Sequence, residues 1–241
     1  MYPAEFAHVY DRLMDDFDYR AWAQYYMDIL SLKPGSMVCE CACGTGLMTV
    51  ELAEYGCVVT GIDLSCDMLG IASEKARARG FKIPFVHKDM CDLSLHKPVD
   101  AILCPCDGVN YLLTDERVSA FFSAAYAGLK TGGAFAFDVS TPEKLLNMPG
   151  ASFYEDRDDV SYFWNTLRES DRVKMHLTFF VRQPGGLYRR FDETQIQRAH
   201  ELSALTQMLT QAGFKDIIAY GDQTHNPANP HDLRWHITAK K

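Results

Sequence analysis

A short apolar strand, Met37 to Cys41, runs directly into the sequence Glu-Cys-Ala-Cys-Gly-Thr-Gly at residues 40–46, here called the glycine turn. The residues that follow, through about Tyr55, have a helical pattern. Such a turn leaves backbone amides free at the start of the helix, and its glycines let a ligand approach the main chain closely. The segment therefore predicts a ligand site at the carboxyl end of a strand in an α/β sheet.

Strands and helices continue to alternate after the glycine turn. Apolar periodicity predicts strands over 58–62, 84–87, 99–104 and 133–139, and helices over 68–79 and 115–129. A Lys-Thr-Gly-Gly stop signal at 130–133 precedes the fifth strand. Two helical stripes between residues 6 and 30 come before the first strand. Five strand–helix alternations imply a mostly parallel, doubly wound sheet.

The segment from about residue 151 to 200 breaks this alternation. Apolar residues occupy every second position from Val173 to Val181, and Gln183 to Gly186 has the composition of a hairpin tip. With 160–167 and 188–198, the segment predicts at least three antiparallel strands. A helix over 201–212 and strands over 217–220 and 233–239 would then complete the first sheet.

Composition narrows the classes of protein to consider. A chain of 241 residues suits one large domain, with or without an insertion, and a net charge of −8 argues against a nucleic-acid partner. No apolar run is long enough to cross a membrane, and the first residues lack a signal-peptide pattern. We therefore expect a cytoplasmic protein with eight reduced cysteines. The spacing of Cys39, Cys41 and Cys43 favours buried strand positions, and we expect no metal site.

Acidic residues stand at three successive strand ends. Glu40 precedes the glycines, Asp63 ends the second strand and Asp89, followed by Met90, ends the third. A nicotinamide dehydrogenase also uses a glycine turn and a second-strand acid, but its fingerprint asks for a small residue where this chain has Thr49. An acid at position 40 suits a sulfonium ligand with a zwitterionic tail better than a diphosphate. The ligand expected is S-adenosylmethionine rather than NAD.

In order and spacing, these segments resemble the successive motifs of class I S-adenosylmethionine-dependent methyltransferases. The resemblance covers residues 37–140 and includes Gly61-Ile62-Asp63-Leu64-Ser65 and Lys88-Asp89-Met90. Tyr10-Asp11, the loop 106–112 and Phe137 to Pro142 are similar to the small-molecule branch, which includes sugar-amine N,N-dimethyltransferases. One departure is Ala42, where many relatives have glycine; we expect it to adopt a negative φ.

The resemblance implies an α/β fold: a doubly wound, Rossmann-like seven-stranded methyltransferase sheet with an inserted antiparallel β-sheet. It divides the chain into an N-terminal helical cap (1–36), a cofactor-binding core (37–145), the inserted sheet as substrate lid or dimer contact (146–200), and a return to the core sheet (201–241).

It also implies cofactor contacts from the strand ends and the N-terminal helices. Glu40 and the glycines would face the methionyl part, Asp63 the ribose, and Asp89 with Met90 the adenine. The N-terminal aromatics would close over the cofactor, although aromatic stripes on helices are also typical of a core. The implied residues are Tyr10, Tyr19, Trp22, Glu40, Cys43, Gly44, Thr45, Gly46, Asp63, Leu64, Met68, Asp89, Met90 and Cys104.

Methyl transfer from a sulfonium is a direct displacement, so the enzyme mainly aligns the acceptor and excludes water. The loop after the fourth strand offers Asp107 and Tyr111 as catalytic candidates, with Asn110 next, and a turn cap is an equal reading of Asp107. Four histidines are possible bases but are more often structural. They are His176, His200, His225 and His231. The acceptor walls expected are Tyr154, Tyr162, Phe163, Trp164 and Tyr188.

The function expected is methyl transfer from S-adenosylmethionine to a small-molecule N or O acceptor, with S-adenosylhomocysteine as product. A non-catalytic cofactor-binding protein and an RNA methyltransferase remain alternatives, although the charge disfavours nucleic acid. No membrane partner is expected. An exposed edge of the inserted sheet predicts a homodimer.

Overall fold

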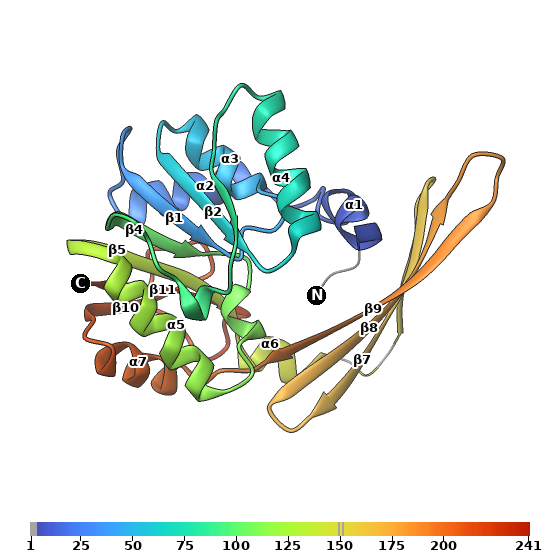
Figure 1. Ribbon diagram of the computed structural model, residues 1–241. Coiled ribbons are helices and arrows are strands. Elements are labelled where there is room, and N and C mark those ends of the chain that lie inside the picture. Colours follow the sequence, from blue (N-terminus) through green and yellow to red (C-terminus); the bar gives the residue numbers. More distant parts are fainter. Residues whose placement is uncertain (1–3, 149, 151) are drawn as a thin grey trace.

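The computed structural model describes residues 4–148, 150 and 152–241. Seven strands form one mixed sheet, the core sheet, in the order β10-β11-β5-β4-β1-β2-β3 (Figure 1). β1 to β5 run parallel, and β11 and β10 close one side antiparallel. The strands are β1 Met37–Cys41, β2 Val58–Asp63, β3 Phe85–His87, β4 Val99–Cys104, β5 Leu129–Ser140, β10 Lys215–Gly221 and β11 Arg234–Lys240. The predicted fold class is confirmed.

Helices cover both faces of the core sheet. α2 and α3 pack with Val38 and Leu103 on one face, whereas α5 and α7 pack with Cys39 and Ile102 on the other. The helices are α1 Ala4–Leu13, α2 Tyr19–Ile29, α3 Leu47–Glu54, α4 Cys66–Ala78, α5 Asp115–Gly128, α6 Pro142–Leu146 and α7 Leu202–Gln211, with short 3₁₀ turns η1 Met90–Asp92 and η2 Gly108–Tyr111. Within the described residues, every helix is too short or too polar to traverse a bilayer.

Four further strands form a separate antiparallel sheet, the inserted sheet, which extends from the core as a long twisted ribbon (Figure 1). They are β6 Ser152–Asp156, β7 Val160–Glu169, β8 Arg172–Arg182 and β9 Tyr188–Arg198, in that order. The predicted hairpin tip is confirmed, because the Gly186 N–H donates to the Gln183 carbonyl at 3.2 Å. α1 lies between α4 and this sheet, and the ring of Phe6 is 5.7 Å from that of Phe179.

The start of β5 differs from the predicted strand. β5 begins at Leu129, whereas the glycine-rich stretch predicted a stop before residue 133. Val99 pairs with Leu129 and Ala101 with Ala134, so the intervening residues form a bulge and do not end the ladder. Gly132, at a φ of 76°, provides the bend.

Candidate cofactor and acceptor site

One cavity of about 920 Å³ lies where the carboxyl ends of the core strands face the inserted sheet. This volume is near the upper end of the usual range for small-molecule pockets. The core side contributes the glycine turn and the ends of β2, β3 and β4, and the opposite wall comes from β7, β8 and β9. Both halves therefore open into the same space.

The two glycines of the glycine turn have different roles. A Cβ added to Gly44 would meet nothing within 4 Å, so this residue presents bare backbone to open space. A Cβ on Gly46 would lie 2.8 Å from the Ala72 Cβ of α4, so Gly46 permits close packing between the turn and that helix. Gly44 lines the cavity and Gly46 lies behind it.

Ala42 does not have the negative φ expected from the sequence. Its φ is 55°, in the left-handed region that favours glycine. The expectation was wrong because the chain must turn sharply from β1 to pass beneath η2. A Cβ on Gly108 of η2 would come 3.2 Å from the Ala42 Cβ, which shows how closely the two segments pack.

Asp63 fixes the shape of the glycine turn. Its two carboxylate oxygens accept hydrogen bonds from the Gly44 N–H and the Ser65 N–H, each at 2.8 Å. A carboxylate oxygen can accept more than one hydrogen bond, so both oxygens retain capacity for a ligand hydroxyl in the cavity. Burial raises the pKa of the Asp63 carboxyl, and these N–H donors oppose the rise.

Glu40 is 2% exposed and lines the core half of the cavity. The Thr49 hydroxyl donates to its carboxylate. Burial raises the pKa of Glu40 to about 8, and the Thr49 hydrogen bond opposes that rise. Thr49, which differs from the small residue of the dehydrogenase fingerprint, is thus the residue that hydrogen-bonds to Glu40.

We expect Glu40→Gln to stabilise the protein at high pH and not at low pH. Between the ordinary pKa of 4.5 and the raised pKa of about 8, the folded protein keeps a proton that the unfolded chain releases, so stability falls as pH rises. Without ligand, the variant should melt near the wild-type temperature at pH 5 and roughly 5 °C higher at pH 8.5. Thermal melts across this range measure the difference, and a pH-independent offset would contradict the prediction.

The side chains that follow the third strand face two different directions. Met90, Lys88 and His87 line the cavity, but Asp89 does not. Its carboxylate accepts hydrogen bonds from the Arg117 guanidinium at 2.7 and 3.0 Å and from the Cys91 N–H at 2.9 Å. Burial acts to raise the pKa of Asp89, and the Arg117 hydrogen bonds lower it below its ordinary value.

The N-terminal helices cover the core half of the cavity. Tyr10 and Tyr19 line it, and burial raises the pKa of both. Trp22 is buried behind them, with the Arg234 guanidinium 5.1 Å from its ring. Asp11, on the same helix as Tyr10, accepts from the Thr45 hydroxyl at 2.5 Å and pairs with Lys75 at 2.6 Å, so α1 is tied to the glycine turn.

The remaining residues implied by the resemblance lie at or just behind the cavity surface. Cys43, Thr45, Leu64 and Met68 line the cavity. Cys104 is fully buried behind it, with its Sγ 3.9 Å from the Met90 Sδ.

The loop after β4 has an unusual backbone. Cys106 and Asp107 have φ values of 58° and 64°, two consecutive left-handed residues without glycine. The carboxylate of Asp138 accepts both of their N–H groups, at 2.7 and 3.1 Å. Arg234 contacts the carboxylates of both Asp107 and Asp138. Each left-handed non-glycine residue costs on the order of 1–3 kcal/mol, so this buried cluster holds the loop against strain.

Asp107 lines the cavity, and its side chain is an ionised carboxylate that is a weak base. Burial acts to raise its pKa, but the charge of Arg234 holds the pKa below its ordinary value. The Ser140 hydroxyl donates to it at 3.0 Å, and Lys144 donates to that hydroxyl at 3.1 Å. A carboxyl group with a depressed pKa accepts protons poorly at neutral pH, so Asp107 suits orientation and charge balance.

The inner face of the inserted sheet forms the other half of the cavity. The lining residues of β7 to β9 are Tyr162, Trp164, Met175, Leu177, Glu193, Thr194, Gln195, Ile196 and Gln197. The Tyr111 hydroxyl donates to Gln195 at 2.9 Å and so joins the loop after β4 to this wall. Asn110 is buried, and its amide binds the backbone of Ser140 and Arg198.

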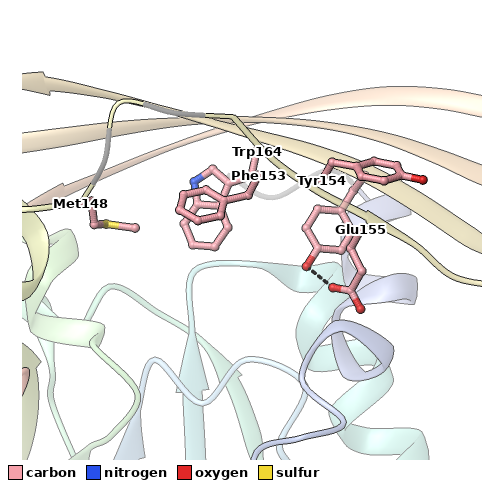
Figure 2. Close-up of a pocket in the computed structure, with 6 residues that line it drawn as sticks. Met148, Phe153, Tyr154, Glu155 and Trp164 are labelled. Atoms are coloured by element: carbon pink, nitrogen blue, oxygen red, sulfur yellow. Dashed lines mark hydrogen bonds between the residues drawn. The ribbon is translucent and has the colours of Figure 1, made fainter.

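Aromatic residues at the rim open onto a smaller hollow of about 340 Å³, which shares Met148, Tyr162 and Trp164 with the cavity. Figure 2 shows Phe153 and Trp164 side by side below the inserted sheet, with ring centroids 5.8 Å apart. Of the predicted acceptor walls, Tyr154, Phe163 and Tyr188 are instead exposed and do not line the cavity, although Tyr154 lines the smaller hollow. Strand alternation turns Phe163 to the face opposite Tyr162 and Trp164.

The four candidate histidines are not among the residues that line the cavity, whereas His87 is. His200 is buried beneath η2, with Nε2 3.2 Å from the Val109 carbonyl oxygen. Burial lowers its pKa to about 4, which marks a neutral structural histidine. The residues that the structure describes contain no group of three or more His, Cys, Asp or Glu arranged to hold a metal.

Comparison with known proteins agrees with this geometry. Residues 38–133 match the family model described as a methyltransferase domain. A protein of Geobacillus sp. (strain WCH70) that is named as a methyltransferase is 35% identical over 98% of this chain and 98% of its own length. The crystal structure of an S-adenosylmethionine-dependent methyltransferase from Clostridium acetobutylicum is 30% identical, with a TM-score of 0.87 over 98% of this chain and 97% of that one. This chain belongs to the S-adenosylmethionine-dependent methyltransferase family.

The methyltransferase uses S-adenosylmethionine as its methyl donor. Its site fits that cofactor because Gly44 leaves room against the main chain and Asp63 keeps acceptor capacity toward the cavity. The dTDP-3-amino-3,4,6-trideoxy-alpha-D-glucopyranose N,N-dimethyltransferase of Streptomyces venezuelae is 26% identical to the methyltransferase over 89% of this chain and 92% of its own.

Proposed function

We propose that this methyltransferase transfers a methyl group from S-adenosylmethionine to a nitrogen or oxygen atom of a small molecule held beneath the inserted sheet. The observation that carries the proposal is the single cavity of about 920 Å³ in which the strand ends of the core sheet face the inner side of the inserted sheet. The similarity to a sugar-amine N,N-dimethyltransferase supports a small acceptor.

The core half of the cavity would hold the cofactor. We assign Glu40, Cys43, Gly44 and Thr45 to its methionyl part and Asp63 to the ribose hydroxyls, with Gly46 shaping the turn from behind. Leu64, Met68 and Met90 would flank the adenine, and Tyr10 and Tyr19 would cover the cofactor. The bound cofactor supplies an electrophilic methyl group on a sulfonium.

Three residues that do not line the cavity would act through others. Trp22 would stack on Arg234, Asp89 would anchor the chain before η1 to Arg117, and Cys104 would support Met90. Each therefore shapes the site from behind without facing the ligand.

The acceptor half would align the acceptor and exclude water. Asp107 would orient a polar group of the acceptor, because its depressed pKa keeps it ionised. Tyr111, bound to Gln195, would set the distance between the loop after β4 and the acceptor wall. Alignment and exclusion of water are the main demands of a direct displacement.

Calorimetry with S-adenosylmethionine, S-adenosylhomocysteine and NAD tests the donor. We expect saturable binding of the first two and none of NAD, and formation of S-adenosylhomocysteine when a panel of small amines and hydroxyl compounds is added. Tight donor binding with no turnover of any small acceptor would favour the non-catalytic alternative. No binding of either sulfur nucleoside would contradict the proposal.

Two further elements belong to the proposal. β6 and β9 are the outer strands of the inserted sheet, so their backbone edges are available for a homodimer contact. Light scattering that reports a monomer at working concentration would remove that element. All eight cysteines are free thiols, which supports a reducing, cytoplasmic location.

A further inference from the structure

Glu193 stands in the middle of the acceptor wall. Alternation along β9 turns Glu193, Gln195 and Gln197 to the same face, and all three line the cavity. Glu193 pairs in the ladder with Leu177, which also lines the cavity, and its own exposure is only 8%. A carboxyl group is therefore placed on an otherwise apolar and amide-lined wall.

Four acids line the cavity, and three of them have donors of their own. Thr49 donates to Glu40, two backbone N–H groups donate to Asp63, and Arg234 pairs with Asp107. Glu193 differs, because nothing in the described part of the chain donates a hydrogen bond to its carboxylate or pairs with it. It is the acid of this cavity whose charge the described residues leave unmatched.

Burying a carboxylate without a donor costs free energy that a ligand can return. Burial raises the pKa of the Glu193 carboxyl. A neutral hydroxyl would satisfy one lone pair of this carboxylate and leave its charge uncompensated. A cationic donor supplies both a hydrogen bond and the opposite charge, and such charge-assisted hydrogen bonds are about twice as strong as neutral ones.

The neighbouring residues agree with a cationic donor at this position. Leu177 and Met175 provide an apolar floor for the carbon skeleton of a ligand, and Gln197 offers amide groups beside it. The cationic side chains of the cavity lie elsewhere. Lys144 and Arg234 are engaged with the Ser140 and Asp107 side of the loop after β4, and Lys88, after β3, donates to the Ser94 hydroxyl. Among the residues described, β7, β8 and β9 contribute no cationic side chain to the cavity lining that could pair with Glu193.

We propose that the methyl acceptor carries a protonated amine and that Glu193 is the specificity-determining residue that binds it. This inference rests on the proposed small-molecule methyl transfer and narrows its acceptor class. The ammonium form is recognised by an ion pair with the carboxylate. Loss of its proton to that carboxylate or to water frees the nitrogen lone pair, which forms the N–C bond as the methyl–sulfur bond breaks and S-adenosylhomocysteine leaves. The remainder of the acceptor lies over the apolar floor toward Tyr111.

The test compares amines with their hydroxyl counterparts on the full-length protein. The pairs are 3-amino-3-deoxyglucose with glucose, glycine with glycolate, and ethanolamine with ethylene glycol, and the readout is S-adenosylhomocysteine formation with mass detection of the methylated product. We expect turnover in at least one pair, restricted to its amine member. With that amine, Glu193→Gln should raise KM at least 10-fold and change kcat much less.

Two matched variants separate recognition from structure. Glu193→Asp keeps the charge and should restore part of the affinity for the amine. Asp192→Asn, on the exposed outer face of the same strand, should match the wild type. The affinity for S-adenosylmethionine should be the same in all four proteins.

The outcomes distinguish the inference from the proposed function. Turnover of the hydroxyl members alone, equal amine KM values in wild type and Glu193→Gln, or no amine turnover while the donor binds would each overturn the inference. Failure of the wild type to bind S-adenosylmethionine would instead overturn the proposed function. A Glu193→Gln protein that binds the donor normally and loses only the amine supports the inference.

Discussion

Asp63→Ala should weaken S-adenosylmethionine binding by at least about 100-fold. The proposed ribose hydroxyls would lose two hydrogen bonds to a charged group, worth roughly 1.5–3 kcal/mol each. The variant also removes the acceptor for the Gly44 and Ser65 N–H groups, so the glycine turn loses its fixed shape. Calorimetry on the purified variant measures the change in affinity.

Two control variants make this result interpretable. Asp63→Asn keeps one acceptor oxygen and should lose less affinity than the alanine variant. Asp67→Ala removes an exposed acid in the first turn of α4 and should bind the cofactor as the wild type does. An unchanged dissociation constant in Asp63→Ala would show that the ribose is held elsewhere.

Arg234→Met should be the most destabilising single substitution near the site. Arg234 is the side-chain cation that pairs with both Asp107 and Asp138, and Asp138 is fully buried. Removing one partner of a buried ion pair costs about 3–5 kcal/mol, which for a domain of this size lowers the melting temperature by roughly 10 °C. Thermal melts at neutral pH measure this loss.

The cause of the loss is identified by a second substitution and by pH. Adding Asp138→Asn should recover part of the stability, because one of the two unpaired charges is then gone. Melts at pH 5 should show a smaller deficit, since protonation of the carboxyl groups removes the same charge. Arg117→Met, which breaks the half-exposed pair with Asp89, should cost less than about 1 kcal/mol. Equal losses in the two arginine variants would contradict this account.

The strand ends that build the cofactor half were predictable because the relevant signals are local. β1 and β4 have the predicted bounds, and β2 ends at Asp63 as expected. The helix after β2 begins at Cys66, two residues before the predicted start, and Ser65 caps it by accepting from the Met68 N–H. An apolar run, a turn and a cap each lie within a few residues of one another, so no tertiary information is needed to find them.

Contacts between distant segments were not predictable. Arg234 lies 127 positions from Asp107 and 96 from Asp138, and an arginine that opens an apolar strand gives no sign of partners so far away. Asp89 was placed at the right strand end, but Arg117 turns its carboxylate away from the cavity. The alternation in β8 was readable, whereas the face of β9 that meets the cavity depends on how the inserted sheet docks on the core.

The two walls of the cavity come from different kinds of chain segment. The proposed donor contacts come from turns at strand ends, where a substitution alters the path of the main chain, as the Gly46 contact with Ala72 shows. The proposed acceptor contacts come from every second side chain of a regular ladder, where a substitution leaves the main-chain pairing unchanged. The proposed division of roles therefore means that substitutions at a few alternate positions of β8 and β9 would change the acceptor wall without altering the turns proposed to hold the methyl donor.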